Sequence, residues 1–208
     1  APRLLLNWQP DAITRVWTGG GVYHQAPRYL DFAADPSNLS LDSERTTHFM
    51  LGFSRHLRDD LRFSAEGYYQ RLGHLTVFDD RTTNTAASIG KGSARGVDLM
   101  LARRMNRGWS ASATYSWSRS RRDDRLGEGE YASDWDRPHA FGIVGAWQPN
   151  DRWTFSAKWK MASGRPTDAF IVHGDVLGGE GPVRYAKELT QANAERLPAY
   201  HALSLRAD

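Results

Sequence analysis

Short turns and long polar segments alternate strictly along this chain, and this alternation limits what the chain can fold into more than any other feature. Tight turns rich in Pro, Asp, Asn and Gly occur at 10–12, 58–60, 106–108 and 149–151. Much longer polar segments lie between them, at 25–43, 75–93, 120–137 and 164–196. A soluble β-sandwich has no physical reason to sort its connections by length, whereas bacterial outer-membrane barrels have short periplasmic turns and long extracellular loops. The alternation therefore predicts antiparallel strands that cross a membrane, with the four long segments outside the cell.

The run from Trp109 to Ser118 shows the strand pattern most clearly. Its odd positions hold Trp, Ala, Ala, Tyr and Trp, and its even positions hold only Ser and Thr. Several runs of this kind reach 10 to 14 residues, and a tilted strand needs about 9–11 residues to cross a membrane. We expect an all-β chain of about nine strands, at 3–9, 13–24, 44–57, 61–74, 94–105, 109–119, 138–148, 152–163 and 197–207.

Two of these runs leave the lipid-facing side undecided. In 13–24, Val16 and Trp17 occupy adjacent positions and therefore compete for the lipid face. In 138–148, Ile143 and Val144 point to opposite faces, so that both faces are apolar. The second apolar face of 138–148 would meet something inside the barrel.

Composition excludes several classes of protein and leaves the barrel open. Cys is absent, so neither a disulfide framework nor a thiolate metal site is possible. No apolar run approaches the roughly 18 residues of a transmembrane helix. The mean hydropathy of -0.61 fits a soluble protein and equally a barrel with a polar lumen. A net charge of +3, from 27 basic and 24 acidic residues, does not favour nucleic-acid binding.

The strand count predicts that the chain is part of a larger barrel. Nine is odd, whereas single-chain bacterial barrels have even numbers of strands. Two open edges in lipid would leave backbone polar groups unpaired. We therefore expect a partial barrel, with residues 1–208 forming part of a single outer-membrane β-barrel domain.

Seven segments in order resemble the TonB-dependent outer-membrane receptors, and the resemblance covers nearly the whole chain. Each segment is weak alone, but their order and spacing together are fairly specific. Asp98 stands where the family's strand start usually has Glu. The segments are Gly19–Pro27, Glu44–Gly52, Leu61–Tyr69, Ala94–Leu99, Ser133–His139, Ala162–Pro166 and Arg196–His201.

The resemblance implies a 22-stranded barrel filled by an N-terminal plug domain, of which this chain would be the C-terminal part of the barrel without the plug. It also implies a location in the outer membrane and energy-coupled uptake of a scarce solute, most often a ferric siderophore. The TonB energy-coupling complex would be contacted through an N-terminal part that precedes this chain. No covalent chemistry and no cofactor are implied. Three alternatives stay open: a passive porin-like channel, another outer-membrane barrel such as an enzyme, and a soluble β-sandwich binding module.

Candidate ligand-binding residues are the aromatic side chains of the long segments. Aromatic rings there would contact a solute arriving from outside the cell. These residues are Tyr29, Phe32, Phe78, Tyr131, Phe170 and Tyr185.

Candidate lipid contacts lie at the start of the segment 120–137. Arg119, Arg121 and Arg122 would meet phosphates of outer-membrane lipid, including lipopolysaccharide, and Arg119 belongs to the same alternation class as the apolar face. A solvated loop of mixed charge is the alternative reading.

No catalytic or metal motif stands out. The seven His residues are scattered without the H-E-x-x-H spacing of a zinc site, and no G-x-S-x-G elbow occurs. The pairs Asp79–Asp80, Asp123–Asp124 and Asp134/Asp136 offer hard oxygen ligands, but without EF-hand spacing they are more typical of solvated loops. Asp136 and Arg137 are also candidates for an ion pair at the base of a loop. We therefore expect neither an enzyme nor a bound metal.

Overall fold

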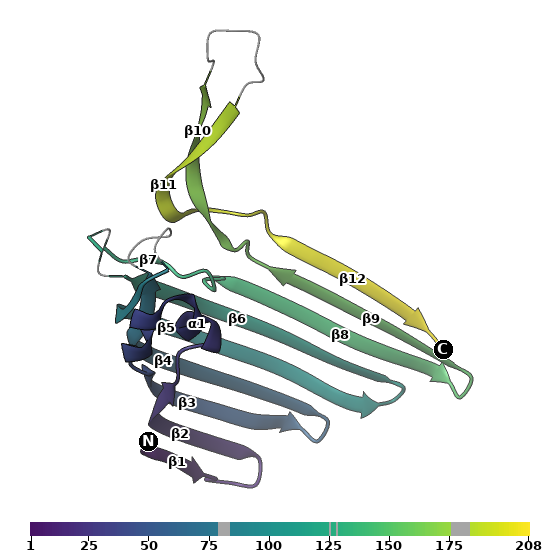
Figure 1. Cartoon of the computed structure of the whole chain (residues 1–208). Coiled ribbons are helices and arrows are strands. Elements are labelled where there is room, and N and C mark those ends of the chain that lie inside the picture. The colour runs from purple at the N-terminus through teal and green to yellow at the C-terminus, as the bar shows by residue number, and fades with distance from the viewer. Residues whose placement is uncertain (79–83, 125, 128, 176–183) are drawn as a thin grey trace.

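The computed structural model of the chain (Figure 1) describes residues 1–78, 84–124, 126–127, 129–175 and 184–208, and for 173–175 and 184–189 it describes the backbone alone. Within these ranges nine long strands follow one another in a single antiparallel sheet. The sheet is open, with β1 and β12 at its two edges (Figure 1). The predicted partial barrel of about nine strands is confirmed. The strands are β1 (Arg3–Trp8), β2 (Thr14–Gln25), β3 (Glu44–Arg58), β4 (Leu61–Phe78), β5 (Ala86–Asn106), β6 (Trp109–Asp123), β8 (His139–Asn150), β9 (Trp153–Ala162) and β12 (Tyr200–Ala207).

The long segments hold more secondary structure than the sequence indicates. Segment 25–43 contains α1 (Tyr29–Ala34) and the 3-10 helix η1 (Pro36–Ser40), and 120–137 contains the short β7 (Tyr131–Ala132) paired with β6. Segment 164–196 contains a hairpin of β10 (Pro166–Asp175) and β11 (Arg184–Arg196), which rises away from the main sheet (Figure 1). No helix in the described ranges is long and apolar enough to cross a membrane.

These additions correct the boundaries expected for the long segments, and the reason is physical. A strand outside the membrane need not carry an apolar face, so it lacks the period-two pattern by which strands are recognised. β4 and β5 also extend past the expected limits at 74 and 94, to Phe78 and back to Ala86.

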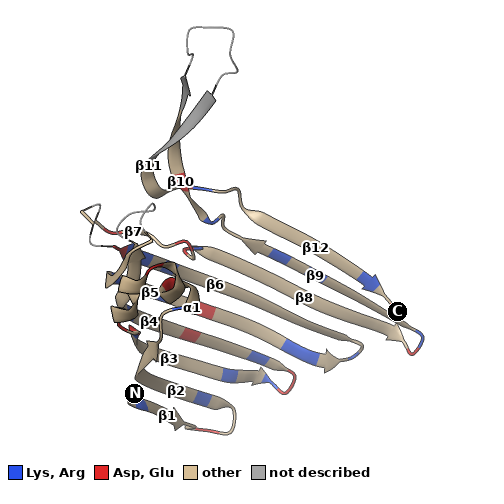
Figure 2. Cartoon of the chain, viewed as in Figure 1, with Lys and Arg blue, Asp and Glu red and all other residues tan. Residues whose placement is uncertain are grey.

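The register of the sheet defines two faces, because directly opposite residues on neighbouring antiparallel strands point to the same side. One row places Leu51 opposite Gly67, then Val97 and Trp117 on the next strands. The adjacent row places Glu66 opposite Asp98 and Ser116. We call these the outer face and the inner face. In Figure 2 acidic positions interrupt β4 and β5 along their length, where the register pairs Glu66 with Asp98.

The same register decides the two undecided strands. Val16 pairs with Phe53 on the outer face, and Trp17 pairs with Gly52 on the inner face. On β8, Ile143 pairs with Trp159 on the outer face and Val144 pairs with Lys158 on the inner face. Both assignments come from the neighbouring strands and not from the runs themselves.

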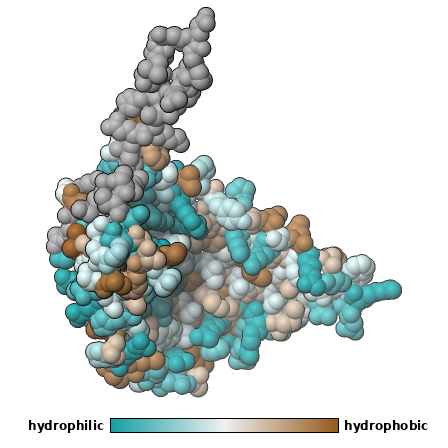
Figure 3. All heavy atoms as spheres, in the orientation of Figure 1, coloured by the Kyte–Doolittle hydropathy of each residue, from teal (hydrophilic) through white to brown (hydrophobic). Residues whose placement is uncertain are grey.

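The outer face is apolar and exposed, as a lipid-contacting surface requires. Leu51 is 61% exposed and Leu203 is 64% exposed. Among the described residues only Leu75, Val77 and Ala132 are buried hydrophobic residues, so the sheet has no conventional core. Hydrophobic residues lie on the visible surface among hydrophilic ones (Figure 3). A soluble sandwich would bury such side chains, since large exposed apolar patches are rare on soluble monomers.

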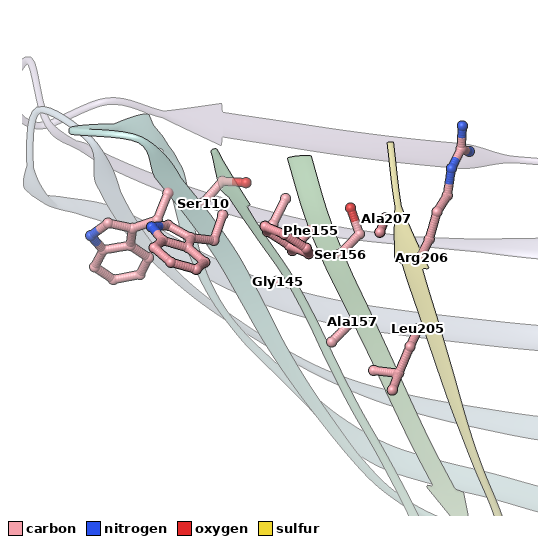
Figure 4. A pocket seen from close by; sticks show the side chains of 11 residues that line it. Ser110, Gly145, Phe155, Ser156, Ala157, Leu205, Arg206 and Ala207 are labelled. Atoms are coloured by element: carbon pink, nitrogen blue, oxygen red, sulfur yellow. The ribbon is translucent and has the colours of Figure 1, made fainter. Parts of the chain in front are cut away.

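Aromatic residues gather on the outer face beside the short turns. Trp147 stacks on Phe155 with 5.8 Å between ring centroids, and Trp153 stacks on the same ring at 6.0 Å. Small residues, among them Gly145 and Ala157, leave a hollow of about 700 Å³ next to these rings (Figure 4). The arrangement matches the aromatic girdle at one membrane interface of a transmembrane barrel.

Candidate functional site

A cavity of about 540 Å³ lies at the loop end of the sheet, and we call it the rim cavity. Its walls come from parts of the chain that are distant in sequence: the segment before α1, the ends of β4 and β6, β7, and the β10–β11 hairpin. Seven lining residues carry charge, with two arginines against five carboxyl groups: Arg28, Arg122, Asp31, Glu44, Asp124, Asp134 and Asp168. Aromatic side chains line it as well.

Arg122, Asp124 and Tyr131 form a connected polar cluster in the wall of the rim cavity. Arg122 forms an ion pair with Asp124 and donates a hydrogen bond of 2.6 Å to the carbonyl oxygen of Thr76. The Tyr131 hydroxyl donates to the same carboxylate at 2.5 Å. Burial, followed by the hydrogen bond to Asp124, raises the pKa of Tyr131. The hydroxyl therefore stays protonated and fixes β7 against the end of β6.

A second cluster holds α1 beside the rim cavity. Arg28 donates to Asp31 through Nη2 at 2.8 Å, and this bonding lowers the pKa of the buried Asp31 carboxyl. The fully buried amide of Asn38 donates to the carbonyl oxygens of Asp31 at 2.7 Å and Asn84 at 2.9 Å. The Asn38 side chain also accepts from the Ala86 backbone at 2.8 Å. These bonds dock α1 and η1 onto the start of β5.

A third set of contacts joins the β10–β11 hairpin to the segment 120–137. Asp136 is 2% exposed and forms an ion pair with Arg196, while its Oδ1 accepts from the Ser120 backbone at 2.6 Å. Asn193 Nδ2 donates to the Ala132 carbonyl oxygen at 2.9 Å and to Asp134 at 2.7 Å. The expected partner of Asp136 was Arg137, and the structure places Arg196 there instead. The partner of Asp136 is not its sequence neighbour, because the fold brings up a residue 60 positions away along the chain.

The structure brings some of the predicted aromatic residues together and separates others. Phe78 and Tyr131 line the rim cavity. Tyr29 is 82% exposed on α1 and, like Phe32 and Phe170, lies outside the lining. The Tyr185 side chain lies outside the described residues, although its backbone pairs with Gly174.

Trp135 lines the rim cavity and was not among the predicted ligand-binding residues. Its indole lies 5.4 Å from the Arg165 guanidinium carbon at the start of the hairpin segment. The signal that could have identified it is the one used for the others, an aromatic residue in a long polar segment.

The three arginines predicted to contact lipid do not share one face. Arg119 pairs with Arg95, and Arg121 pairs with Ser93, in rows that belong to the outer face. Arg122 pairs with Gly92 and Tyr131 on the inner side and lines the rim cavity. Arg122 is therefore removed from the lipid-contact set, because adjacent strand residues point to opposite faces.

The acidic pairs do not form a metal site in the described part of the chain, where no group of three or more His, Asp or Glu residues is placed to hold an ion. Asp124 already binds Arg122 and Tyr131, and Asp136 already binds Arg196. Asp79 and Asp80 lie outside the described residues. What the rim cavity offers is non-covalent binding, through aromatic surface, hydrogen-bond donors and carboxylates.

The inner face of β6 and β9 carries hydroxyl and lysine side chains, with the apolar Val144 of β8 between them. Lys158 and Lys160 line a hollow of about 430 Å³ together with Ser112 and Thr114.

Comparison with known proteins agrees with the geometry. The family model described as "TonB dependent receptor-like, beta-barrel" matches residues 1–208. No curated protein matches the sequence.

Solved structures resemble the whole chain at low sequence identity. The siderophore receptor PiuA from Acinetobacter baumannii matches with a TM-score of 0.74 and 15% identity. The ferric-catecholate import receptor Fiu from E. coli K12 matches at 0.69 and 14%, and the iron transporter FrpB from Neisseria meningitidis at 0.70 and 12%. Each match covers 99% of this chain but only 28%, 28% and 31% of those proteins, respectively. At such identities the likeness establishes the fold alone.

Proposed function

Because this chain belongs to the β-barrel family of the TonB-dependent receptors, which are transporters of the outer membrane, we propose that it forms part of a receptor for energy-coupled uptake of a scarce solute. The proposed solute is an iron chelate of the siderophore type. PiuA and Fiu are described as a siderophore receptor and a ferric-catecholate import receptor. This chain spans less than a third of either protein, so the activity proposed is that of the full-length receptor.

The observation that carries the proposal is the rim cavity. It opens at the loop end of the sheet, and four separate segments of the chain contribute polar and aromatic side chains to it. A chelate arriving from outside the cell would stack on aromatic rings and exchange hydrogen bonds with the polar wall. Phe78, Tyr131 and Trp135 are the proposed primary contacts. The other predicted aromatic residues form a proposed outer set: Tyr29, Phe32, Phe170 and Tyr185.

We also propose that residues 1–208 belong to one barrel domain whose inner face packs against a plug domain of the full-length protein. The inner face of β6 and β9, with Lys158 and Lys160 beside hydroxyl side chains, is suited to hydrogen-bonded contact with such a domain. The plug and the N-terminal segment would in turn couple the receptor to the TonB complex.

Uptake of a radiolabelled ferric siderophore by cells that carry the full-length receptor tests the proposal. We expect accumulation that depends on both the receptor and a functional TonB. Equal accumulation in cells without TonB would contradict energy-coupled import. Steady ion conductance by the purified receptor in a planar bilayer would instead favour a passive channel.

A further inference from the structure

The outer face of β3–β6 changes from apolar to basic at the loop end of the sheet. The register brings six basic residues into neighbouring rows there, and we call them the outer basic patch. Arg95 lies opposite Arg119, and Gly73 lies between Arg45 and Lys91 on the two flanking strands. Arg71 and Arg121 both lie opposite Ser93. The patch consists of Arg45, Arg71, Lys91, Arg95, Arg119 and Arg121.

The change from apolar to basic falls within two residues of one level on three adjacent strands: Arg95 lies opposite Arg119, and Tyr69, the last apolar residue before Arg71, lies opposite Arg95. Two residues beyond Tyr69 comes Arg71 on β4, and two residues beyond Trp117 comes Arg119 on β6. On β5, which runs the other way, Val97 gives way to Arg95. Charged residues on the lipid face are costly at the bilayer centre and nearly free of cost at the interface, where aromatic residues gather. The patch therefore lies at the level of the outer-leaflet headgroups.

Within the described part of the chain, the side-chain charges of the patch have no acidic partner. Among the described residues, none of the six side chains forms a hydrogen bond, an ion pair or a cation–π contact, and five of them are exposed, with Arg121 half-buried. By contrast, Arg28, Arg122 and Arg196 at the same end of the sheet all pair with carboxylates. One acidic residue, Asp123, lies opposite Lys91 at the margin of the patch.

A hollow within the patch can receive an anionic group. It measures about 320 Å³ and its lining includes Arg45, Arg71 and Lys91. Its floor is Gly73, where an added Cβ would meet nothing within 4 Å. Three cationic side chains thus surround open space beside the lipid-facing surface.

We propose that the outer basic patch binds the phosphate groups of a lipopolysaccharide-type lipid of the outer leaflet. Guanidinium groups bind phosphate oxygens through paired hydrogen bonds. Four strands at a spacing of about 4.8 Å make the patch about 15 Å wide, which is enough for more than one phosphate. The patch faces away from the rim cavity, so this lipid is distinct from the imported solute and its binding does not depend on the proposed uptake function.

The test compares the purified full-length receptor with two matched quadruple variants. The patch variant carries Arg71→Gln, Arg95→Gln, Arg119→Gln and Arg121→Gln. The control carries the same change at four arginines beside the short turns, Arg55, Arg58, Arg107 and Arg152. Bis-phosphorylated lipid A is titrated into detergent-solubilised protein, and bound lipid is counted by native mass spectrometry.

We expect the patch variant to bind this lipid more weakly, by roughly fivefold for each arginine removed, and the control to bind like the unchanged receptor. Wild-type receptor should bind dephosphorylated lipid A far more weakly, and millimolar inorganic phosphate should compete poorly because it lacks the acyl chains. These two measurements use the wild-type receptor alone, so they test the proposal even if the patch variant fails to fold. Equal binding by patch variant and control, or of phosphorylated and dephosphorylated lipid, would overturn the proposal.

Discussion

Trp17 on β2 donates a hydrogen bond of 2.7 Å from its indole nitrogen to Glu66 on β4, two strands away. The bond is possible because β3 carries Gly52 between them. A Cβ atom at Gly52 would lie only 2.0 Å from the indole ring, so the indole lies flat across the strand. One glycine thus allows a polar link between strands that do not pair directly.

Replacing Gly52 by alanine should destabilise the barrel by about 1–3 kcal/mol, because the indole must leave its position and Glu66 loses its donor. The unfolding temperature of the full-length receptor in detergent measures this change, and it is read from the different gel mobilities of the folded and unfolded protein. Gly67→Ala is the matched control, since its nearest neighbour would be 3.9 Å away. If both variants unfolded at the same temperature as the wild type, the proposed role of Gly52 would be wrong.

Replacing Arg196 by alanine should loosen the β10–β11 hairpin, because the buried Asp136 carboxylate loses its cationic partner. Removing one partner of a fully buried ion pair costs about 3–5 kcal/mol, and the partial exposure of Arg196 places the effect below that range. Amide hydrogen exchange over residues 166–175 and 184–196 should become about tenfold faster or more. Arg137→Ala should leave the exchange unchanged, and an equal effect of both variants would refute the Arg196 assignment.

Alkaline titration should separate Tyr131 from the exposed tyrosines. Its folded pKa is raised above the ordinary value of 10.0, so its protonated form stabilises β7 and the rim cavity fully below pH 10, and this stabilisation is lost as the pH rises through the folded pKa. Tyrosinate absorbance should be the same in wild type and Tyr131→Phe up to about pH 10, the ordinary tyrosine pKa. If the Tyr131→Phe variant showed less tyrosinate absorbance than the wild type below this pH, Tyr131 would ionise like an exposed tyrosine and the prediction would be wrong.

Phe78→Ala should weaken binding of a ferric tris(catecholate) chelate to the full-length receptor by up to about tenfold, because a stacked aromatic ring contributes roughly 0.5–1.5 kcal/mol. Tyr29→Ala removes an aromatic side chain that lies outside the rim cavity, and we expect a change of less than about twofold. Fluorescence quenching on titration with the chelate provides the measurement. A larger loss from Tyr29→Ala than from Phe78→Ala would move the binding site to the surface of α1.

Much of the fold was predictable because the alternating residues of a membrane strand reflect the two environments that its faces contact. The alternation from Trp109 to Ser118 identified β6 and its lipid face, since each side chain on it faces either lipid or the interior. The short turns and the order of the nine strands followed from the same pattern. The hairpin β10–β11 was not predictable in this way, because a strand surrounded by water has no required apolar face.

The candidate site residues were also only partly predictable from the sequence. Phe78 and Tyr131 were identified as aromatic residues of long segments, but that criterion also selected Tyr29 and Phe170, which lie outside the rim cavity. What separates them is the position of each segment above the sheet, which is fixed by contacts such as those of Asn38 and Asp136 between distant residues.

The sequence by itself determined that this chain forms antiparallel membrane-spanning strands with loops of unequal length at the two ends, because local alternation and turn chemistry are properties of neighbouring residues. Only the tertiary structure decided which face Trp17 occupies, which arginine pairs with Asp136, and that Arg71, Arg95 and Arg119 lie side by side. These outcomes depend on the register between strands, and register is set by pairing partners that no single stretch of sequence contains.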